Sequence, residues 1–485
     1  MTCVPVHSGS PSHEGKETVS LKRPTTPDEK YEWITTAPLP GLISSLAVPT
    51  IISMLITAVY NMADTFFVGH LGTSAQGAVG VVFALMAIIQ AIGFTFGQGS
   101  GNQVSRLLGQ RQEETALRVA STGFFTALIA GAVLSAAALL NLDALVRSLG
   151  ATETILPYAR DYTLFILVGA PYMAASLVLN NLLRFEGNAF YGMLGIASGA
   201  VLNIALDPLF IFVLDMGVGG AALATIISQF VSFCILVAQC GRGGSLPIHI
   251  RYFSPSLSMY RSIFRNGMPS LYRQGLASIA AICLNTAANP YGDAAITAMT
   301  VVSRVTAFAG SALIGFGQGF QPVCGFNFGA GLYGRVRRGF WFCVRVSFSF
   351  LILLSVLGLV FAPQIILFFQ KNDPDVVAIG ARALRLQCLT LPLTSWVILT
   401  NMTLQTSGQS TQASFLAMAR QGLFSLPLIW ILPRFLDLWG VQLAQPIADS
   451  FSFLLSVALG TAFLQKLSRL EAQTDAVAPR QPRRL

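Results

Sequence analysis

Long apolar runs, separated by short polar breaks, make up most of the chain between Leu42 and Leu464. A helix needs about 20 mostly apolar residues to cross the hydrocarbon core of a bilayer. Twelve segments reach that length, at residues 42–67, 75–98, 117–140, 157–182, 190–214, 218–240, 262–288, 294–318, 339–364, 377–402, 412–433 and 440–464. Strands of membrane barrels are about half as long, so the pattern predicts an all-α membrane protein with twelve transmembrane helices.

The composition also points to a bilayer as the main solvent. Hydrophobic residues make up 53% of the chain and charged residues 11%, whereas a soluble domain carries about 25% charged residues. The seven cysteines and four histidines lack the spacing of metal ligands or disulfides. The sequence shows no phosphate-binding loop and no nucleophilic triad. We therefore expect no enzyme and no cofactor, and active transport would draw its energy from an ion gradient.

Basic residues collect in the loops on one side of the predicted membrane. That side holds Arg106, Arg111, Arg118, Arg184, Arg242, Arg251, Arg261, Arg265, Arg335, Arg337 and Arg338. The opposite loops hold only Arg147, Lys371 and Arg434. By the positive-inside rule, both termini are predicted to be cytoplasmic in a multi-pass plasma-membrane protein. The formal charge of +9 then needs no nucleic-acid partner.

Polar segments frame the apolar part of the chain. Residues 1–38 and 466–485 read as cytoplasmic tails, the first of them disordered and without the apolar region of a signal peptide. Residues 241–261 contain Gly-Arg-Gly-Gly and two prolines, which is typical of a linker. The remaining segments, 39–240 and 262–465, each hold six predicted helices.

These two segments repeat each other. An offset of 220 residues pairs Pro49 with Pro269 and superposes Phe-Gly-Gln-Gly at 96–99 on the same four residues at 316–319. Because six helices is an even number, both halves start on the same side, and their symmetry axis should run along the membrane normal. The sequence predicts two pseudo-symmetric six-helix lobes that rock against each other.

Carboxylates inside predicted helices are the first candidates for function, because an unpaired charge in hydrocarbon costs several kcal/mol. Asp64 and Asp207 lie in the first half, each one helical turn after a polar residue, Tyr60 and Asn203 respectively. Thr225 lies at a plausible depth in the next helix. Together these side chains could hold a proton or a hard cation such as Na⁺.

The alternative is structural: Asp207 and Pro208 would only cap or kink a helix, and Asp64 would lie near the interface. The repeat favours the functional interpretation. At the 220-residue offset, Asp64 faces Leu284, and the segment that matches Asn203 and Asp207 carries no acid. A purely architectural group should recur in both halves, whereas a coupling site need occur only once.

Further charged residues lie within the predicted helices. Asp449 is the only deep acid of the second half, and it is either a site residue or a satisfied structural one. Arg304 could line a substrate cleft or pair with a carboxylate. Arg273 is better placed to extend toward the cytoplasmic side.

Four stretches resemble the multidrug and toxic compound extrusion (MATE) family, in its bacterial DinF/MepA-like branch. They are Ala-Val-Pro at 47–49, YNMADTFFVG at 60–69, LNIALDP at 202–208 and QPVCGFNFGA at 321–330. The resemblance covers residues 40–465. It implies a V-shaped pair of six-helix lobes that export cationic or amphipathic drugs by H⁺ or Na⁺ antiport.

The resemblance also assigns Tyr60, Asp64, Asn203, Asp207 and Thr225 to the family's cation site in the amino-terminal lobe. Some members carry acids in helices 7 and 10, but this chain has none there, which argues against a second cation site. We expect a monomer whose partners are small drugs and the bilayer. The alternative function is a flippase for lipid-linked saccharides or another amphipathic lipid on a related fold.

Overall fold

The computed structural model describes residues 26–242, 245–369 and 373–477, and every element in them is helical. The first half contains α1 (Pro27–Thr36), α2 (Leu39–Gly69), α3 (Thr73–Gly109), α4 (Glu113–Leu140), α5 (Leu142–Ser148), α6 (Leu156–Phe185), α7 (Ala189–Pro208), η1 (Leu209–Val213) and α8 (Gly217–Gln239). The second half contains η2 (Ile250–Tyr252), α9 (Leu257–Ala288), η3 (Asn289–Tyr291), α10 (Asp293–Gly329), α11 (Tyr333–Phe369), α12 (Pro374–Thr390), α13 (Leu393–Thr406), α14 (Ser410–Met418), η4 (Ala419–Ser425), α15 (Leu426–Ile431) and α16 (Pro433–Val477).

Every predicted span coincides with one helix or with a run of consecutive helical segments. Among the described residues, ten spans are long and apolar enough to cross a membrane, and the bent pair α12–α13 makes an eleventh. The remaining predicted span is α9, which has 32 residues but carries Arg261, Arg265 and Arg273. Its length of about 48 Å exceeds the roughly 30 Å hydrocarbon core, so its arginines lower its hydropathy without shortening it.

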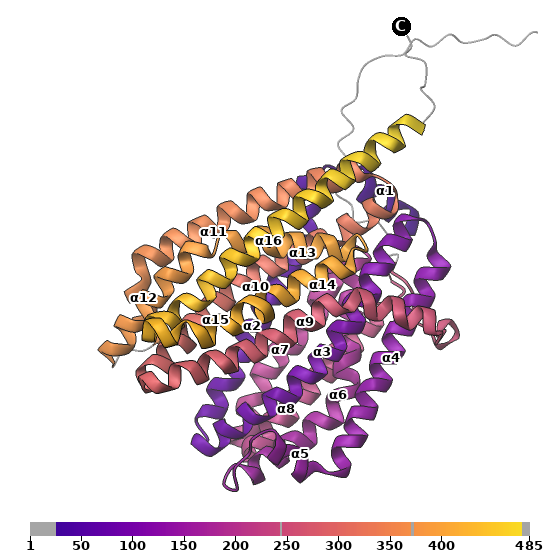
Figure 1. Ribbon diagram of the computed structural model, residues 1–485. Helices are drawn as coiled ribbons and strands as arrows, with labels where there is room; N and C mark the ends of the chain where they lie inside the picture. The colour runs from indigo at the N-terminus through magenta and orange to yellow at the C-terminus, as the bar shows by residue number, and fades with distance from the viewer. Residues whose placement is uncertain (1–25, 243–244, 370–372, 478–485) are drawn as a thin grey trace, which may run out of the picture.

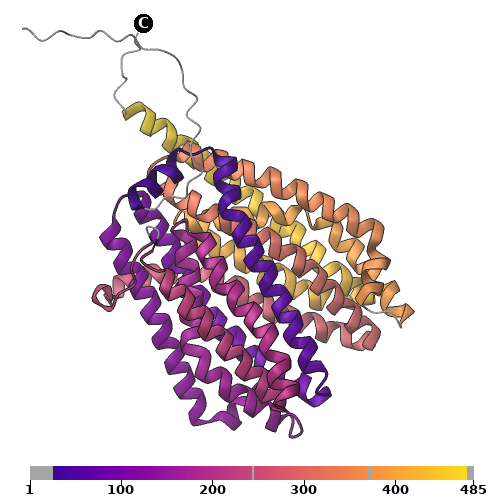
Figure 2. The same ribbon diagram turned by 180° about the vertical axis from the view of Figure 1, so that it is seen from behind.

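The two halves of the chain form two bundles that lie side by side. Figures 1 and 2 show the helices of the first half, indigo to magenta, beside those of the second half, rose to yellow. α2 belongs to both bundles: Ile43 and Leu46 pack in a core made mostly by the second half, and Val68 packs in a core of the first half. α9 mirrors this arrangement, with Ile263 in a first-half core and Ala288 in a second-half core. A movement of α2 or α9 must therefore act on both bundles.

Glycines bring the backbones of the two halves together near the end that carries α1. A Cβ on Gly109 would lie 2.2 Å from the backbone oxygen of Phe326. A Cβ on Gly329, the repeat partner of Gly109, would lie 2.1 Å from the backbone oxygen of Arg106. Only residues without a side chain allow α3 and α10 to approach this closely.

Residues 27–36 correct the prediction of a disordered tail up to residue 38, because they form α1. Thr26 and Glu29 form a capping box, in which the Thr26 hydroxyl accepts from the Glu29 backbone N–H and the Glu29 carboxylate accepts from that of Thr26. Pro27 starts the helix, where its missing N–H costs nothing. The residue types at positions 26–29 already predict this cap from the sequence. Residues 1–25 lie outside the described residues.

α1 docks against both halves at the end of the molecule where the C terminus emerges (Figure 1). Its Ile34 is fully buried. Arg335, at the start of α11, donates to the carbonyl oxygens of Ala37, at 2.7 Å, and of Ile34, at 3.4 Å. A guanidinium suits the unpaired carbonyls at a helix C terminus.

On the side of the first half, Lys30 of α1 is buried close to Glu186, which follows α6. The Leu246 backbone N–H donates to the Glu186 carboxylate at 3.0 Å. Burial raises the pKa of Glu186 and lowers that of Lys30, and the attraction between the two charges offsets part of each shift. α1 is thus held to one half by Arg335 and to the other by a buried pair of titratable groups.

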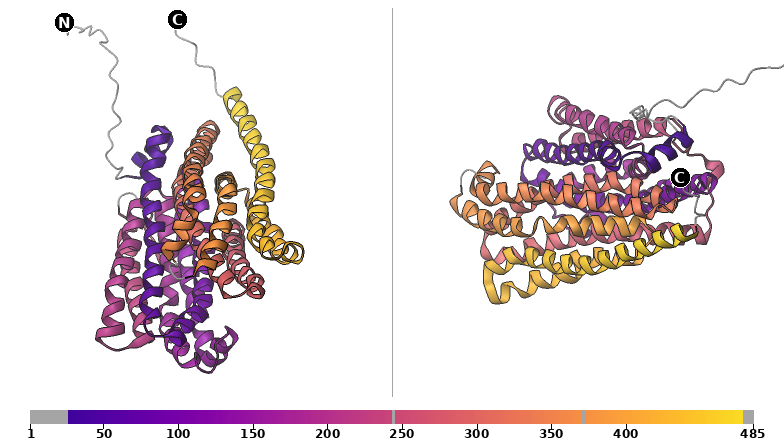
Figure 3. Two further views of the ribbon diagram at one scale, coloured as in Figure 1. Left: turned by 90° about the vertical axis from the view of Figure 1, so that its left-hand side faces the viewer. Right: turned by 90° about the horizontal axis from the view of Figure 1, so that it is seen from above.

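The helical part of the chain continues beyond the last predicted span, which ends at residue 464. α16 runs to Val477 and extends past the neighbouring helices (Figure 3). Its Glu471 forms an ion pair with Arg337 of α11 at 3.1 Å, which ties this extension to the bundle. Residues 478–485 lie outside the described part of the chain.

Candidate cation-binding site

Helices α2, α7 and α8 bring the predicted first-half residues together. Asp207, Asn203 and Thr225 are all buried, with Asp207 fully so. The Asn203 side-chain amide donates to Asp207 Oδ1 at 3.2 Å and to Thr225 Oγ1 at 3.4 Å. The amide therefore links α7 to α8 and orients one oxygen of the Asp207 carboxylate.

α2 contributes Asp64 and Tyr60 to the same region. The Asp64 carboxylate lies close enough to act electrostatically on Asp207 and on the Tyr60 hydroxyl. Tyr60 is buried, and Asp64 is half-buried. Two carboxylates that share one buried site repel each other unless a cation or a proton joins them.

Within the described part of the chain, several oxygens of this site have no hydrogen-bond partner. They are Asp64 Oδ1, Asp207 Oδ2 and Asn203 Oδ1, all of them buried acceptors. A buried acceptor without a partner costs about 1–3 kcal/mol, and more when it is charged. An ordinary structural site would satisfy them with N–H or O–H groups. Three unpaired oxygens in one place instead form a set of ligands suited to a proton or a hard monovalent cation.

Pro208 shapes the helix that carries Asp207. It removes one backbone donor and so frees the carbonyl oxygen of Ile204. The structure confirms a local change of helix geometry, because η1 follows directly as a π-helical turn over Leu209–Val213. π-Helical turns occur often at functional sites in membrane and soluble proteins.

Tyr162 of α6 is a member of this region that the sequence interpretation missed. It is buried, and Asp64, Asp207 and Tyr60 all act electrostatically on its hydroxyl. The hydroxyl oxygen has no hydrogen-bond partner among the described residues. The sequence feature that could have identified Tyr162 is the polar pair Tyr162 and Thr163 within an otherwise apolar span.

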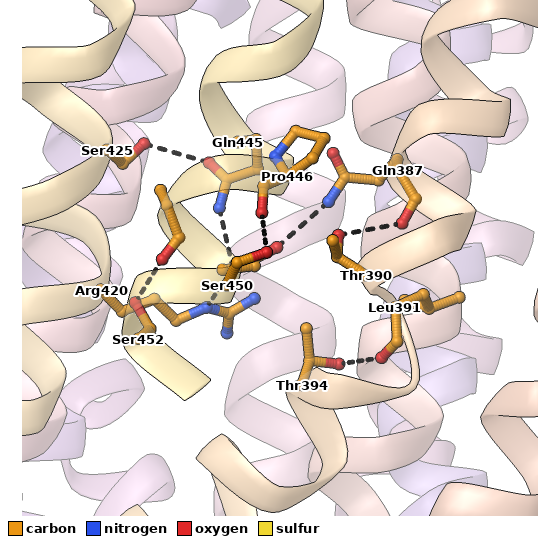
Figure 4. Close-up of polar contacts among 12 residues, drawn as sticks. Gln387, Thr390, Leu391, Thr394, Arg420, Ser425, Gln445, Pro446, Ser450 and Ser452 are labelled. Carbon is orange, nitrogen blue, oxygen red and sulfur yellow. Dashed lines mark hydrogen bonds and ion pairs between the residues drawn. The ribbon is translucent and has the colours of Figure 1, made fainter. Parts of the chain in front are cut away.

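Asp449 of α16 lies in a separate polar cluster in the second half. Arg420, on η4, approaches its Oδ1 at 2.9 Å, Gln445 donates to the same oxygen at 3.1 Å, and Gln387 of α12 donates to Oδ2 at 3.2 Å. Figure 4 shows that the side chains of Arg420, Gln387 and Gln445, from η4, α12 and α16, point toward the same region. Both oxygens of Asp449 have partners, so the geometry fits a satisfied structural residue better than a cation site.

Arg304 and Arg273, the two arginines predicted to lie within spans, have different surroundings. Arg304 is exposed on α10 and makes no hydrogen bond or ion pair within the described part of the chain. Arg273 of α9 is half-buried and lines a small cavity of ≈ 30 Å³ with Arg420 and Asn401. That volume holds about two water molecules.

Among the described residues, no group of three or more His, Cys, Asp or Glu side chains could hold a metal ion. The first-half cluster is instead made of two carboxylates, an amide and hydroxyl groups. Such all-oxygen sets suit H⁺ or Na⁺ rather than transition metals.

Comparisons with known proteins show the family of the chain. The MatE family model matches the chain twice, at residues 49–209 and 269–431, and so follows the internal repeat. The multidrug export protein MepA of Staphylococcus haemolyticus is 26% identical over 424 residues, which cover 87% of this chain and 93% of that protein. MepA of Staphylococcus aureus is 25% identical over 434 residues, or 89% of this chain and 96% of that protein.

Solved structures give the same result. A MATE crystal structure in complex with MaL6 matches with a TM-score of 0.85 at 27% identity, over 91% of this chain and 99% of that one. A multidrug resistance MATE transporter of the MOP superfamily, solved in its outward-facing conformation, matches with a TM-score of 0.84 at 27% identity, over 90% of this chain and 98% of that one. The repeat, the helical architecture and these matches together establish that the chain belongs to the MATE family of membrane transporters.

Proposed function

We propose that this protein exports amphipathic or cationic drugs in exchange for H⁺ or Na⁺, and that the cation binds among Asp64, Asn203, Asp207 and Thr225. The relatives named as multidrug export proteins support the class of substrate. The observation that carries the proposal is the set of unpaired buried oxygens on Asp64, Asn203 and Asp207. A cation or proton that arrives gives these oxygens a partner, so its binding releases free energy at this site.

α2 offers a route from the cation to the rest of the molecule. Asp64 lies in its distal part, near Val68 in a core of the first half, whereas Ile43 and Leu46 pack in a core of the second half. A cation that draws Asp64 toward Asp207 changes the path of α2, and α2 contacts both α7 and α10. The cation can shift the lobes only by binding one arrangement more tightly than the other.

The lobes in this proposal are residues 39–240 and 262–465, joined by the linker 241–261. The two matches of the family model support this division. We place both termini in the cytoplasm of a plasma-membrane protein, because the arginine-rich loops lie on the side where the chain begins. The proposed working unit is a monomer, since each chain holds both lobes and the complete cation site.

Dye efflux from proteoliposomes tests the coupling. Purified protein would be reconstituted with a lipophilic cationic dye inside, and a pH gradient or a Na⁺ gradient would be imposed separately. We expect one of these gradients to drive efflux in the native protein. Asp64→Asn and Asp207→Asn should each abolish gradient-driven efflux, because an amide cannot exchange a proton and binds Na⁺ poorly.

Asp161→Asn is a matched control. Asp161 precedes Tyr162 on α6 but is exposed, so the same chemical change leaves the buried oxygens intact. Its efflux should equal that of the native protein. Full gradient-driven efflux in Asp64→Asn, with normal amounts of protein in the vesicles, would contradict the proposed coupling site.

A further inference from the structure

A basic hollow on α11 is separate from the cation site. It is an open surface hollow of about 590 Å³, lined by Arg337, Arg338, Trp341, Phe342 and Arg345. All the lining residues come from the first part of one helix, at the end of the molecule that also carries α1 and the last turns of α16.

The spacing of these residues puts charge and aromatic surface on one face. Arg338, Trp341, Phe342 and Arg345 stand at positions i, i+3, i+4 and i+7, which share one side of an α-helix. Seven residues cover about 10 Å along the axis. The two arginines therefore bracket two aromatic rings, and a phosphate between them lies within reach of both guanidinium groups.

These arginines differ in what they already bind. Arg337 is paired with Glu471 at 3.1 Å and donates to Ser468 at 3.1 Å. Among the described residues, Arg338 donates only to a backbone oxygen of its own helix, that of Gly334, at 3.3 Å. Arg345 is exposed and makes no ion pair or hydrogen bond with the described residues. The hollow thus has positive charge that no carboxylate of the described chain neutralises.

The position of Arg345 along α11 indicates what kind of group neutralises this positive charge. Residues 346–369 follow it without a single charged side chain. These 24 residues, in a helix that bends at Phe361, have a length of about 36 Å along the helix path, slightly more than the hydrocarbon core. Arg345 therefore lies at the boundary of the hydrocarbon, at the depth of lipid headgroups, and Trp341 occupies the interfacial position that tryptophan favours. An arginine at this depth needs an anion or must extend to water.

An apolar track continues from the hollow into the bilayer. Phe348, Ile352 and Val356 lie on the same face of α11 as Arg345, and they are 39%, 42% and 51% exposed. A free phosphate ion would use only the arginines. A phospholipid would use both the arginines and this track, since its acyl chain can lie along the exposed apolar side chains.

We infer that this hollow is a binding site for an anionic glycerophospholipid of the leaflet facing α1, with its phosphate between Arg338 and Arg345 and an acyl chain along Phe348 and Ile352. The aromatic rings of Trp341 and Phe342 support the glycerol region. Arginine forms bidentate contacts with phosphate, and basic pockets on helices bind anionic headgroups in this way.

Native mass spectrometry of the full chain in a neutral detergent tests the site by titration with phosphatidylglycerol and with phosphatidylcholine. We expect the native protein to bind phosphatidylglycerol in preference to phosphatidylcholine. Arg345→Gln and Arg338→Gln should each weaken the binding of phosphatidylglycerol about tenfold, because each removes a charge-assisted contact with the phosphate. Arg345→Lys should retain most of it.

Arg118→Gln is the matched control. Arg118 is an exposed arginine near the same end, paired with Glu114 at 2.7 Å, so its loss changes the net charge equally but leaves the hollow intact. Equal binding by Arg345→Gln and Arg118→Gln would overturn the inference. Competition by glycerol 3-phosphate at concentrations equal to those of the lipid would also overturn it, since the site would then recognise phosphate alone.

A second measurement guards against misfolding of the variants. Phosphatidylglycerol should raise the melting temperature of the native protein and of Arg118→Gln, but not that of Arg345→Gln. A melting temperature of native protein that is unchanged by phosphatidylglycerol would contradict the site without any use of the variants.

Discussion

The contact between α3 and α10 offers the sharpest test of how the two halves move. Gly109→Ala places a Cβ where the backbone oxygen of Phe326 lies only 2.2 Å away. A backbone oxygen cannot rotate aside as a side chain can, so the two helices must separate by about 1 Å. Overpacking of this kind costs about 1–3 kcal/mol, and the cost falls only on the arrangement in which the helices touch.

This cost translates into a population shift. If the protein exchanges between this arrangement and one with α3 and α10 apart, then 1–3 kcal/mol moves the equilibrium by about 5–150-fold toward the latter. Cys324 of α10 is a native reporter of the change, because it is fully buried near Ser407. The experiment uses protein in which the other six cysteines are replaced, so that Cys324 alone reacts. Its labelling by a water-soluble maleimide should accelerate by the same factor.

The same two helices supply controls. Gly80 of α3 and Gly310 of α10 have nothing within 4 Å of an added Cβ. Gly80→Ala and Gly310→Ala should therefore label Cys324 at the native rate, whereas Gly329→Ala should behave like Gly109→Ala. If Gly109→Ala and Gly80→Ala label equally, the two ends do not separate at this contact, and the rocking mechanism loses its support.

Three further predictions concern other parts of the molecule. Burial raises the pKa of Glu186 to about 7 and lowers that of Lys30 to about 8. When α1 is docked, Glu186 holds its proton more tightly, and Lys30 holds its proton less tightly, than when both groups are in water. Docking therefore strengthens as pH falls below about 7 and as it rises above about 8. Amide hydrogen exchange in residues 27–36, corrected for the intrinsic exchange rate, should be fastest between pH values of about 7 and 8. Glu186→Gln should remove the slowing of exchange that the native protein shows as pH falls. Exchange that does not vary with pH would refute this account. Asp449→Asn leaves the Arg420 guanidinium without its buried partner and should lower stability by about 3 kcal/mol in thermal unfolding; an unchanged melting temperature would show the pair to be dispensable. Tyr162→Phe removes a buried hydroxyl that makes no hydrogen bond of ordinary geometry with the described residues, so it should leave stability unchanged within about 1 kcal/mol but weaken cation-driven efflux. Native efflux in this variant would exclude Tyr162 from the site.

The sequence alone determined the membrane class, the helices and the repeat. Apolar length is a local property of the chain, so all twelve predicted spans coincide with helical segments. The two acids of the candidate cation site could also be identified from the sequence, because an acid in a span is costly wherever the helix packs. Even the capping box at Thr26, which the prediction of a disordered tail overlooked, can be read from the residue types.

Only the tertiary structure decided which of these polar groups lack partners. Asp64, Asp207 and Asp449 look alike in the sequence, yet Asp449 has three donors around it and the other two keep unpaired oxygens. Tyr162 joins the site through packing of α6 against the neighbouring helices, which no local pattern encodes. The physical reason is that hydrogen-bond satisfaction depends on atoms far apart along the chain, whereas hydropathy is already present in each segment.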